Sequence, residues 1–275
     1  MARIALGLLG GFCLLYLLTA LLLFAVQRRL IYPAPRAPFP TASGFQDVRL
    51  RTSDGLALRA LHKPGDDALP TILFLHGNGD SLGGAIKATE ALAAAGYGLM
   101  LPEYRGYGGN PGRPSEAGLY RDGEAALRWL AERGTGPDRV VPVGNSLGSG
   151  VATELAARHP VAGLVLISGF SSLPDVAAFH MRYFPARRLV LDRYDNAAKL
   201  PRVTAPVLVL HGAADTLVPV AHAETLARAA RRSDAEIMPG VGHELAYLPR
   251  SGAAVLRWLH RRVGKGAETR TDGRR

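Results

Sequence analysis

Three residues of this sequence, Ser146, Asp215 and His243, are of the types and in the order that could perform nucleophilic catalysis. A serine hydroxyl is a poor nucleophile until a base accepts its proton, and a histidine base acts best when a carboxylate orients its ring. We expect His243 to take the proton of Ser146, and Asp215 to hold and stabilise the imidazolium. The pattern predicts acyl transfer through an acyl-enzyme intermediate.

The surroundings of Ser146 favour this role. The motif Gly144-Asn145-Ser146-Leu147-Gly148 follows an apolar run and precedes a segment of small residues. A strand, a tight turn and a helix in this order form a nucleophile elbow, which projects the serine hydroxyl above the sheet. Side chains two residues before and after the serine would collide with neighbouring backbone, and the glycines at 144 and 148 avoid that collision.

Two backbone N–H groups are predicted to bind the oxyanion that forms when the serine attacks a carbonyl. One belongs to Leu147, directly after the nucleophile, where the start of a helix also favours negative charge. The other is expected from the loop after the apolar run TILFL, where Asn78 lies in His76-Gly77-Asn78-Gly79. Removing one such donor typically lowers the rate about 10²- to 10³-fold.

Two stretches of the sequence share one pattern, which could indicate an internal repeat or a metal site. LFLHGNGD (73–80) and LVLHGAAD (208–215) both fit Leu-x-Leu-His-Gly-x-x-Asp, but their surroundings are dissimilar. A metal site would need both aspartates aimed inward beside His76 and His211, and no other ligand spacing is present. We predict structural imidazoles at His76 and His211, a helix-start carboxylate at Asp80, and neither metal nor other cofactor.

The Gly-rich loop PEYRGYGGNPGRPSE (102–116) could suggest phosphate binding. It lacks the Gly-Lys-Ser/Thr end of a P-loop and the spacing of Gly-x-Gly-x-x-Gly. We expect a turn packed beside the site instead.

The elements that must position these residues are short, continuous apolar runs, each followed by a helix-like segment. The runs are TILFL, YGLML, RVVPV, VAGLVLI and PVLVL, and the predicted helices cover 81–95, 116–132, 147–158 and 220–231. Such runs are typical of strands buried on both faces, so we predict an α/β fold with a mostly parallel, doubly wound sheet. Ligands bind at the carboxyl ends of the strands in such sheets. Alternating apolar residues at 46–52 and 56–62, around Ser53-Asp54-Gly55, predict a preceding β-hairpin.

Residues 169–205 are longer than an ordinary connection between strands and predict a small helical lid. We expect one α/β domain over 45–262, after a connector over 31–44 and before a basic polar tail over 263–275.

The N-terminal segment is long and apolar. From Ile4 to Val26, 23 consecutive residues carry no charge, and their helix of about 35 Å matches a hydrocarbon core of about 30 Å. A cleaved signal usually has a shorter apolar part and a small-x-small site, which is poor here, but it stays an alternative, as does a buried helix. Phe12 before Cys13 argues against a lipidated cysteine. We predict an uncleaved single-pass anchor over 1–30.

We expect such an anchor to place the protein in the cell's inner membrane as a single-pass protein. Arg28 and Arg29 directly after the span favour a cytoplasmic domain over Arg3 and the free amine before it, although large domains can cross regardless of such charges.

Charge and cysteine content exclude other classes. The net charge is +10, but residues 1–36 and 261–275 each contribute +4, which leaves +2 for the body of the chain. Basic ends suggest anionic lipid headgroups or solvated termini, so nucleic acid is not an expected partner. The single cysteine excludes a disulfide framework within the chain.

Taken together, the motifs resemble those of the α/β-hydrolase superfamily over about residues 45–262. They are His76-Gly77-Asn78, Tyr104-Arg105-Gly106-Tyr107-Gly108, Pro114-Ser115-Glu116, Gly144-Asn145-Ser146-Leu147-Gly148, Asp215 with Val218-Pro219, and Gly242-His243. The set is similar to a membrane-anchored branch of serine hydrolases, related to monoacylglycerol lipases, protein depalmitoylases and prolyl-oligopeptidase-type peptidases. Glu103 and Asn110 depart from that branch, where aspartate and serine are common. The resemblance implies hydrolysis of an acyl bond, usually an ester or thioester.

Our hypothesis is a serine hydrolase acting on a small or lipid-like acyl substrate and tethered to a membrane, of undetermined oligomeric state. A peptidase with the same three residues and a catalytically silent, membrane-tethered binding module are the alternatives. Serine rather than aspartate at position 146 argues against dehalogenase and epoxide-hydrolase chemistry.

Overall fold

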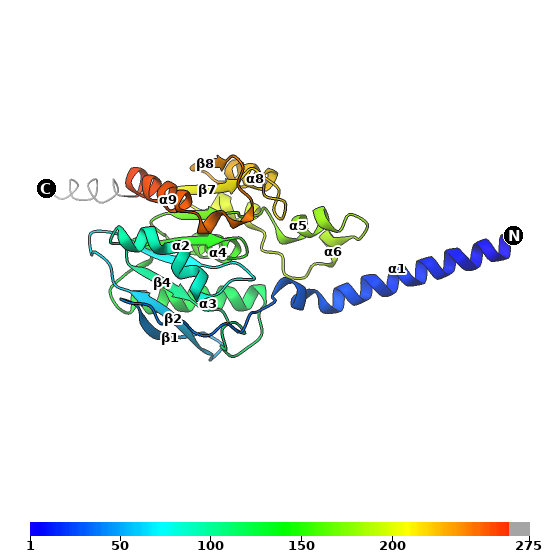
Figure 1. Cartoon of the computed structure of the whole chain (residues 1–275), viewed down its shortest axis with the longest axis horizontal. Coiled ribbons are helices and arrows are strands. Elements are labelled where there is room, and N and C mark those ends of the chain that lie inside the picture. The colour runs from blue at the N-terminus through cyan, green and yellow to red at the C-terminus, as the bar shows by residue number, and fades with distance from the viewer. Residues whose placement is uncertain (264–275) are drawn as a thin grey trace.

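A single eight-stranded sheet forms the centre of the computed structural model, which describes residues 1–263 (Figure 1). The predicted tail therefore lies, apart from residue 263, outside the described residues. The strand order is β1-β2-β4-β3-β5-β6-β7-β8. The strands are β1 (Gln46–Arg51), β2 (Ala57–Lys63), β3 (Thr71–Leu75), β4 (Leu99–Pro102), β5 (Val140–Asn145), β6 (Leu164–Ile167), β7 (Val207–Gly212) and β8 (Ser233–Met238).

The pairing of the strands confirms the predicted α/β fold. β1 and β2 form the expected antiparallel hairpin, and β2 also runs antiparallel to β4. From β4 onward, every neighbouring pair is parallel. β4 and β6 are shorter than their apolar runs because each begins only after a glycine, Gly98 and Gly163, which has no side chain to pack in a strand.

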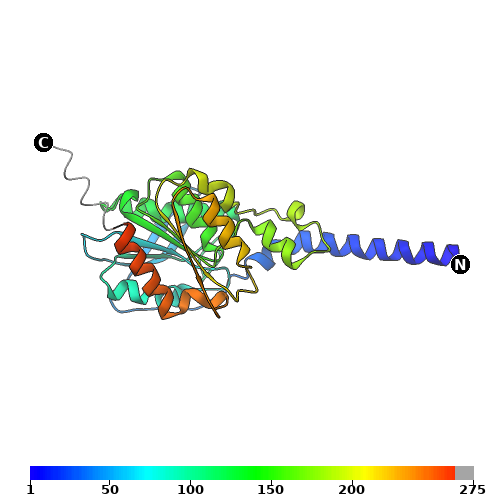
Figure 2. The same cartoon turned by 90° about the horizontal axis from the view of Figure 1, so that it is seen from above.

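Helices cover both faces of the sheet (Figures 1 and 2). They are α2 (Leu82–Ala94), α3 (Glu116–Ala131), α4 (Gly148–Arg158), α8 (Ala221–Ala229) and α9 (Pro249–Arg262), with short 3₁₀ turns η1 (Pro137–Arg139) and η3 (His243–Tyr247). α2 and α9 enclose one apolar core with the sheet, whereas α3, α4 and α8 enclose the other. The central strands are thus buried on both sides, as their continuous apolar runs predicted.

The segment between β6 and β7, residues 169–205, is called the lid segment below. It contains α5 (Leu173–His180), α6 (Ala186–Leu189), α7 (Asn196–Lys199) and η2 (Leu200–Arg202). Figures 1 and 2 both show α5 and α6 beside the base of the N-terminal helix.

The N-terminal helix α1 (Ala2–Ile31) projects away from the sheet (Figure 1). Its mean hydropathy over 18 residues is 2.4, and none of that window is buried within the protein. A helix buried in the core is therefore excluded. By length and composition, α1 is able to cross a membrane.

Candidate active site

Ser146, Asp215 and His243 meet at the carboxyl edge of the parallel strands. Ser146 lies in the turn between β5 and α4, Asp215 follows β7, and His243 opens η3 after β8. The His243 Nε2 atom is 2.9 Å from the Ser146 hydroxyl oxygen, and the His243 Nδ1 atom is 2.7 Å from an Asp215 carboxylate oxygen. These contacts can pass a proton from a hydroxyl to an imidazole whose other nitrogen is held by a carboxylate.

The turn that carries Ser146 is strained, with the serine in the left-handed region at φ +50°. Backbone surrounds the two flanking glycines. A Cβ atom on Gly148 would lie 1.9 Å from the Leu75 carbonyl oxygen, and one on Gly144 would lie 2.4 Å from the Gly148 carbonyl oxygen. Only glycine fits at either position without moving a strand or helix backbone.

Asp215 is held as an ionised acceptor. Its Oδ1 atom accepts hydrogen bonds from the backbone N–H groups of Leu217 (2.9 Å) and Val218 (2.8 Å), which leaves Oδ2 for His243. Burial on its own raises the pKa of this carboxyl, but the hydrogen bonds from His243 and Val218 outweigh it and hold the pKa below its ordinary value. The carboxylate can therefore stabilise a positive imidazolium.

His211 lies beneath this carboxylate. Its Nε2 atom donates to the Val218 carbonyl oxygen at 2.8 Å, and burial lowers the pKa of the ring. This neutral imidazole fixes the loop between Asp215 and Val218, in line with the structural role expected of it.

The loop after β3, residues 76–81 and called the β3 loop below, lies against Ser146. A Cβ atom on Gly77 would be 3.5 Å from the Ser146 Cβ atom. Within residues 1–263, the backbone N–H groups of Asn78 and Leu147 make no hydrogen bond. The Asn78 side chain is engaged elsewhere, since its amide nitrogen donates to the carbonyl oxygen of Ile31 at 3.1 Å. Both N–H groups are thus free to bind an anion.

Sequence reasoning missed Tyr247, which connects three segments of the site. Its hydroxyl donates to the Asp80 Oδ2 atom at 2.6 Å, and the side-chain amide of Asn145 donates to the Tyr247 hydroxyl at 3.5 Å. Burial and the neighbouring Asp80 raise the pKa of Tyr247, which keeps it a neutral donor. Its place four residues after His243 was the only available sequence signal, because its partners are distant in the chain.

Asp80 differs in part from its prediction as a helix-start carboxylate. Its Oδ1 atom accepts from the Ser81 backbone N–H at 2.7 Å, next to the beginning of α2. However, the N-cap residue is Ser81, and the second carboxylate oxygen of Asp80 binds Tyr247. Asp80 therefore joins the β3 loop to the segment that carries His243.

His76 and Glu103 form a buried pair under the β3 loop. The His76 Nε2 atom is 2.9 Å from a Glu103 carboxylate oxygen, and its Nδ1 atom is 2.8 Å from the Gly77 carbonyl oxygen. Burial lowers the pKa of His76, but Glu103 outweighs burial and raises it overall. Within residues 1–263, no group of three His, Cys, Asp or Glu side chains is arranged to hold a metal ion.

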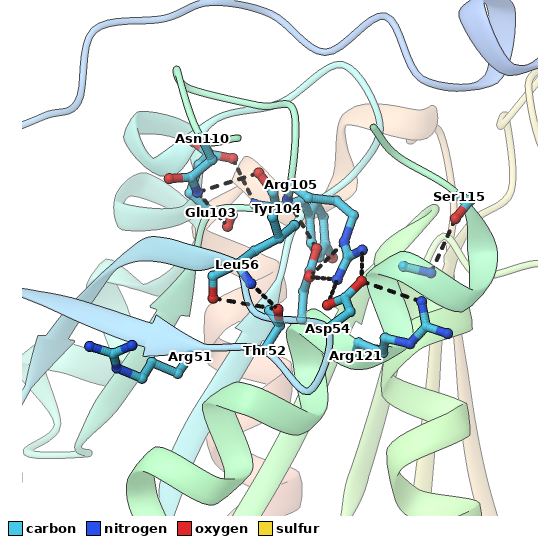
Figure 3. Close-up of polar contacts among 12 residues, drawn as sticks. Arg51, Thr52, Asp54, Leu56, Glu103, Tyr104, Arg105, Asn110, Ser115 and Arg121 are labelled. Carbon is cyan, nitrogen blue, oxygen red and sulfur yellow. Dashed lines mark hydrogen bonds and ion pairs between the residues drawn. The ribbon is translucent and has the colours of Figure 1, made fainter. Parts of the chain in front are cut away.

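The loop after β4 packs against the β1–β2 hairpin and the start of α3 (Figure 3). The Arg105 guanidinium donates twice to Asp54, at 2.7 and 3.1 Å, and once to Asp122 at 2.9 Å. Asn110 donates to the Glu103 carbonyl oxygen at 2.9 Å and accepts from the Arg59 N–H at 3.0 Å. Arg105 is paired with two carboxylates and Asn110 with backbone groups of neighbouring segments, so this part of the loop is a packed turn.

Comparisons with known proteins bear on the family and the fold. The family model described as "alpha/beta hydrolase fold" matches residues 70–202. An uncharacterised protein of Mycobacterium tuberculosis is 41% identical over 229 residues, which cover 80% of this chain and 82% of that protein. A lysophosphatidylserine lipase of Danio rerio is 31% identical over 219 residues, covering 72% of this chain and 56% of the lipase.

A solved structure shares the fold. An esterase of Pyrococcus furiosus superposes with a TM-score of 0.71 at 20% identity, covering 85% of this chain and 98% of the esterase.

Proposed function

Because the chain belongs to the alpha/beta-hydrolase fold family, being 32% identical to the human alpha/beta hydrolase domain-containing protein 17B over 70% of this chain and 67% of that protein, we propose that it is a serine hydrolase that cleaves a carboxylic ester or thioester. The observation that carries this proposal is the continuous contact from Ser146 through His243 to Asp215, at 2.9 and 2.7 Å. The catalytic unit would be the domain over 45–262, and α1 would anchor it in a membrane.

Acylation begins when the Ser146 hydroxyl oxygen attacks the acyl carbonyl carbon and its proton passes to the His243 Nε2 atom. Asp215 stabilises the imidazolium. The N–H groups of Asn78 and Leu147 bind the oxyanion, which is the charge that develops most in the transition state. When the intermediate collapses, the ester C–O or thioester C–S bond breaks and the leaving group takes the proton from His243.

Deacylation repeats these steps with water. A water molecule gives its proton to His243 as its oxygen attacks the acyl carbon of the acyl-enzyme. The second oxyanion collapses, the Ser146 oxygen leaves and recovers the proton, and the carboxylic acid departs. The proposal requires no metal or cofactor.

A lipid-like substrate is supported by the apolar α1 beside the site and by the lipase named among the relatives. A substrate dissolved in the bilayer would reach a tethered enzyme by diffusing within the membrane.

The test is labelling by a fluorophosphonate probe followed by an ester screen. The full chain in detergent should be labelled, and Ser146→Ala should abolish labelling. The matched control is Ser171→Ala, because the Ser171 hydroxyl lies 2.8 Å from the His222 Nδ1 atom and forms another serine–histidine contact. Unchanged labelling of Ser146→Ala would contradict the assignment.

The ester screen should compare a p-nitrophenyl ester series with long-chain acyl thioesters and peptide amides. We expect turnover of esters or thioesters. Faster cleavage of peptide amides would identify a peptidase instead, and no turnover of any activated ester would indicate a silent binding module.

A further inference from the structure

An apolar groove of about 120 Å³ runs between α1 and the lid segment. Every side chain along it is apolar except that of Gln27. Its lining consists of Ala20, Leu23, Phe24, Gln27, Leu30 and Ile31 on α1 and Ala177, Met181, Phe184, Ala186, Leu189 and Val190 on the lid segment. Figure 2 shows these two parts of the chain side by side.

Polar contacts at the domain end of the groove fix α1 to the lid segment. The Gln27 side chain donates to the Leu189 carbonyl oxygen at 3.2 Å and accepts from the Leu191 N–H at 2.8 Å. One residue further, Arg28 forms an ion pair with the Asp192 carboxylate at 3.0 Å. These contacts pair the polar groups at the edge of the groove, and the side chains that line its floor are apolar.

An aromatic contact fixes the other end. The Tyr16 ring stacks on the Phe184 ring with centroids 5.2 Å apart, and the Tyr16 hydroxyl donates to the Tyr183 carbonyl oxygen at 2.9 Å. The groove is therefore a defined channel held at both ends, rather than a chance gap between two elements.

The domain end of the groove contacts the β3 loop, which lies against Ser146. Ile31, at its domain end, accepts the hydrogen bond from Asn78 in the β3 loop. The neighbouring residue of that loop, Gly77, lies against Ser146. An apolar chain lying in the groove would extend past Ile31 along this loop toward Ser146.

The outer wall of the groove faces away from the protein. Phe24 and Leu30 line it and yet are 39% and 62% exposed. On the adjacent lid segment, Phe179, Tyr183 and Leu191 are also exposed. Exposed apolar side chains next to a membrane helix are suited to the interface of a bilayer, so the groove would open toward lipid.

We propose that this groove binds the acyl chain of the substrate, which slides in from the bilayer along α1. This inference rests on the proposed hydrolase and anchor. Ala20 to Ile31 span about 17 Å along the helix axis, which suits an extended alkyl chain.

The test is a change in chain-length preference. Ala20→Trp and Ala177→Trp each place an indole in the groove from one of its two walls. The control is Leu22→Trp, because Leu22 is 61% exposed on α1 and does not line the groove.

In detergent, we expect kcat/KM for p-nitrophenyl palmitate to fall about tenfold or more in the two groove variants, since several buried methylene groups lose their site. Activity toward p-nitrophenyl butyrate should stay within about twofold, and Leu22→Trp should match the wild type on both esters. Equal losses on both esters, or an unchanged palmitate rate, would overturn the proposal. A change in oligomeric state without a change in chain-length preference would identify the groove as a contact between copies, which also overturns it.

A binding measurement separates this inference from the catalytic one. A palmitate analogue carrying a photoreactive diazirine should label peptides from residues 20–31 and 177–190 of the Ser146→Ala variant. Ala177→Trp introduced into that variant should reduce the labelling. Labelling of other peptides would refute binding of the acyl chain in the groove, even if hydrolysis were established. Labelling of the groove in a protein without esterase activity would support acyl-chain binding there and refute the proposed hydrolase function.

Discussion

Individual residues of the site are held by contacts that differ greatly in sequence separation. The motif around Ser146 is local, so its five residues could be identified from the sequence alone. The order of the serine, aspartate and histidine was also visible, because each follows a predicted strand. Tyr247 could not be identified, because its hydrogen bond to Asp80 joins residues 167 positions apart and depends on how α2 and η3 pack.

Tyr247 is expected to be a positioning residue. Tyr247→Phe removes only the hydroxyl that joins Asp80 to Asn145, which directly precedes Ser146. Losing a hydrogen bond to a carboxylate typically costs about 1.5–3 kcal/mol, and part of this cost should appear as misplacement of Ser146, the proposed nucleophile. We expect kcat for an activated ester to fall about tenfold with KM nearly unchanged.

The control for this variant is Tyr183→Phe, because the Tyr183 side chain is exposed and its hydroxyl makes no hydrogen bond to any residue within 1–263. A purely structural role for Tyr247 would lower the unfolding midpoint and leave kcat per active site, counted by fluorophosphonate titration, at the wild-type value. That outcome would refute the positioning role.

At the level of elements, the sheet was predictable and its connections were less so. Continuous apolar runs identified the parallel strands because strands buried on both faces have no polar side to reveal an alternation. The first residues of β4 and β6 were predicted too early, because hydropathy does not reveal that a glycine directly before each strand delays its start. The loop after β4 was predicted to be a packed turn, but its pairing of Arg105 with Asp54 depends on the hairpin lying alongside (Figure 3).

The close packing of the turn between β5 and α4 leads to a prediction about stability. Gly148→Ala would place a methyl group 1.9 Å from the Leu75 carbonyl oxygen, so either β3 or α4 must shift. Overpacking of this kind typically costs about 1–3 kcal/mol, and we expect a loss of unfolding free energy at the upper end of that range. Chemical denaturation followed by circular dichroism measures it.

Gly79→Ala provides the comparison, because nothing lies within 4 Å of a Cβ atom at that position. It should change the unfolding free energy by less than about 0.5 kcal/mol. Similar stabilities of the two alanine variants would show that the turn relaxes more easily than its geometry indicates.

For the molecule as a whole, the sequence predicted an apolar helix ahead of an α/β fold but not how the two meet. Length and lack of charge identify α1 from local sequence. Its contacts with the lid segment, such as the ion pair of Arg28 with Asp192, join residues more than 160 positions apart. No local pattern encodes such a contact.

The proposed anchor leads to a prediction about the whole protein. We expect the full chain to stay in the membrane pellet after an alkaline carbonate wash and to keep its N-terminal residues, as measured by intact mass. Deleting residues 2–22 should release the protein, because the remaining part of α1 is too short to span about 30 Å of hydrocarbon. Recovery of a soluble wild-type chain that lacks the apolar segment would instead show that this segment is a cleaved signal.

The hydrogen bond from Asn78 to the carbonyl oxygen of Ile31 has a mechanical consequence. It ties the final residue of α1 to the loop whose N–H group is proposed to receive the oxyanion. If α1 spans a bilayer, its apolar stretch of about 35 Å is somewhat longer than the hydrocarbon core and would adjust to it by tilting. The tilt changes with bilayer thickness, so the same protein should turn over its substrate at different rates in thin and thick membranes. The activity of the protein would then report the thickness of the bilayer around it.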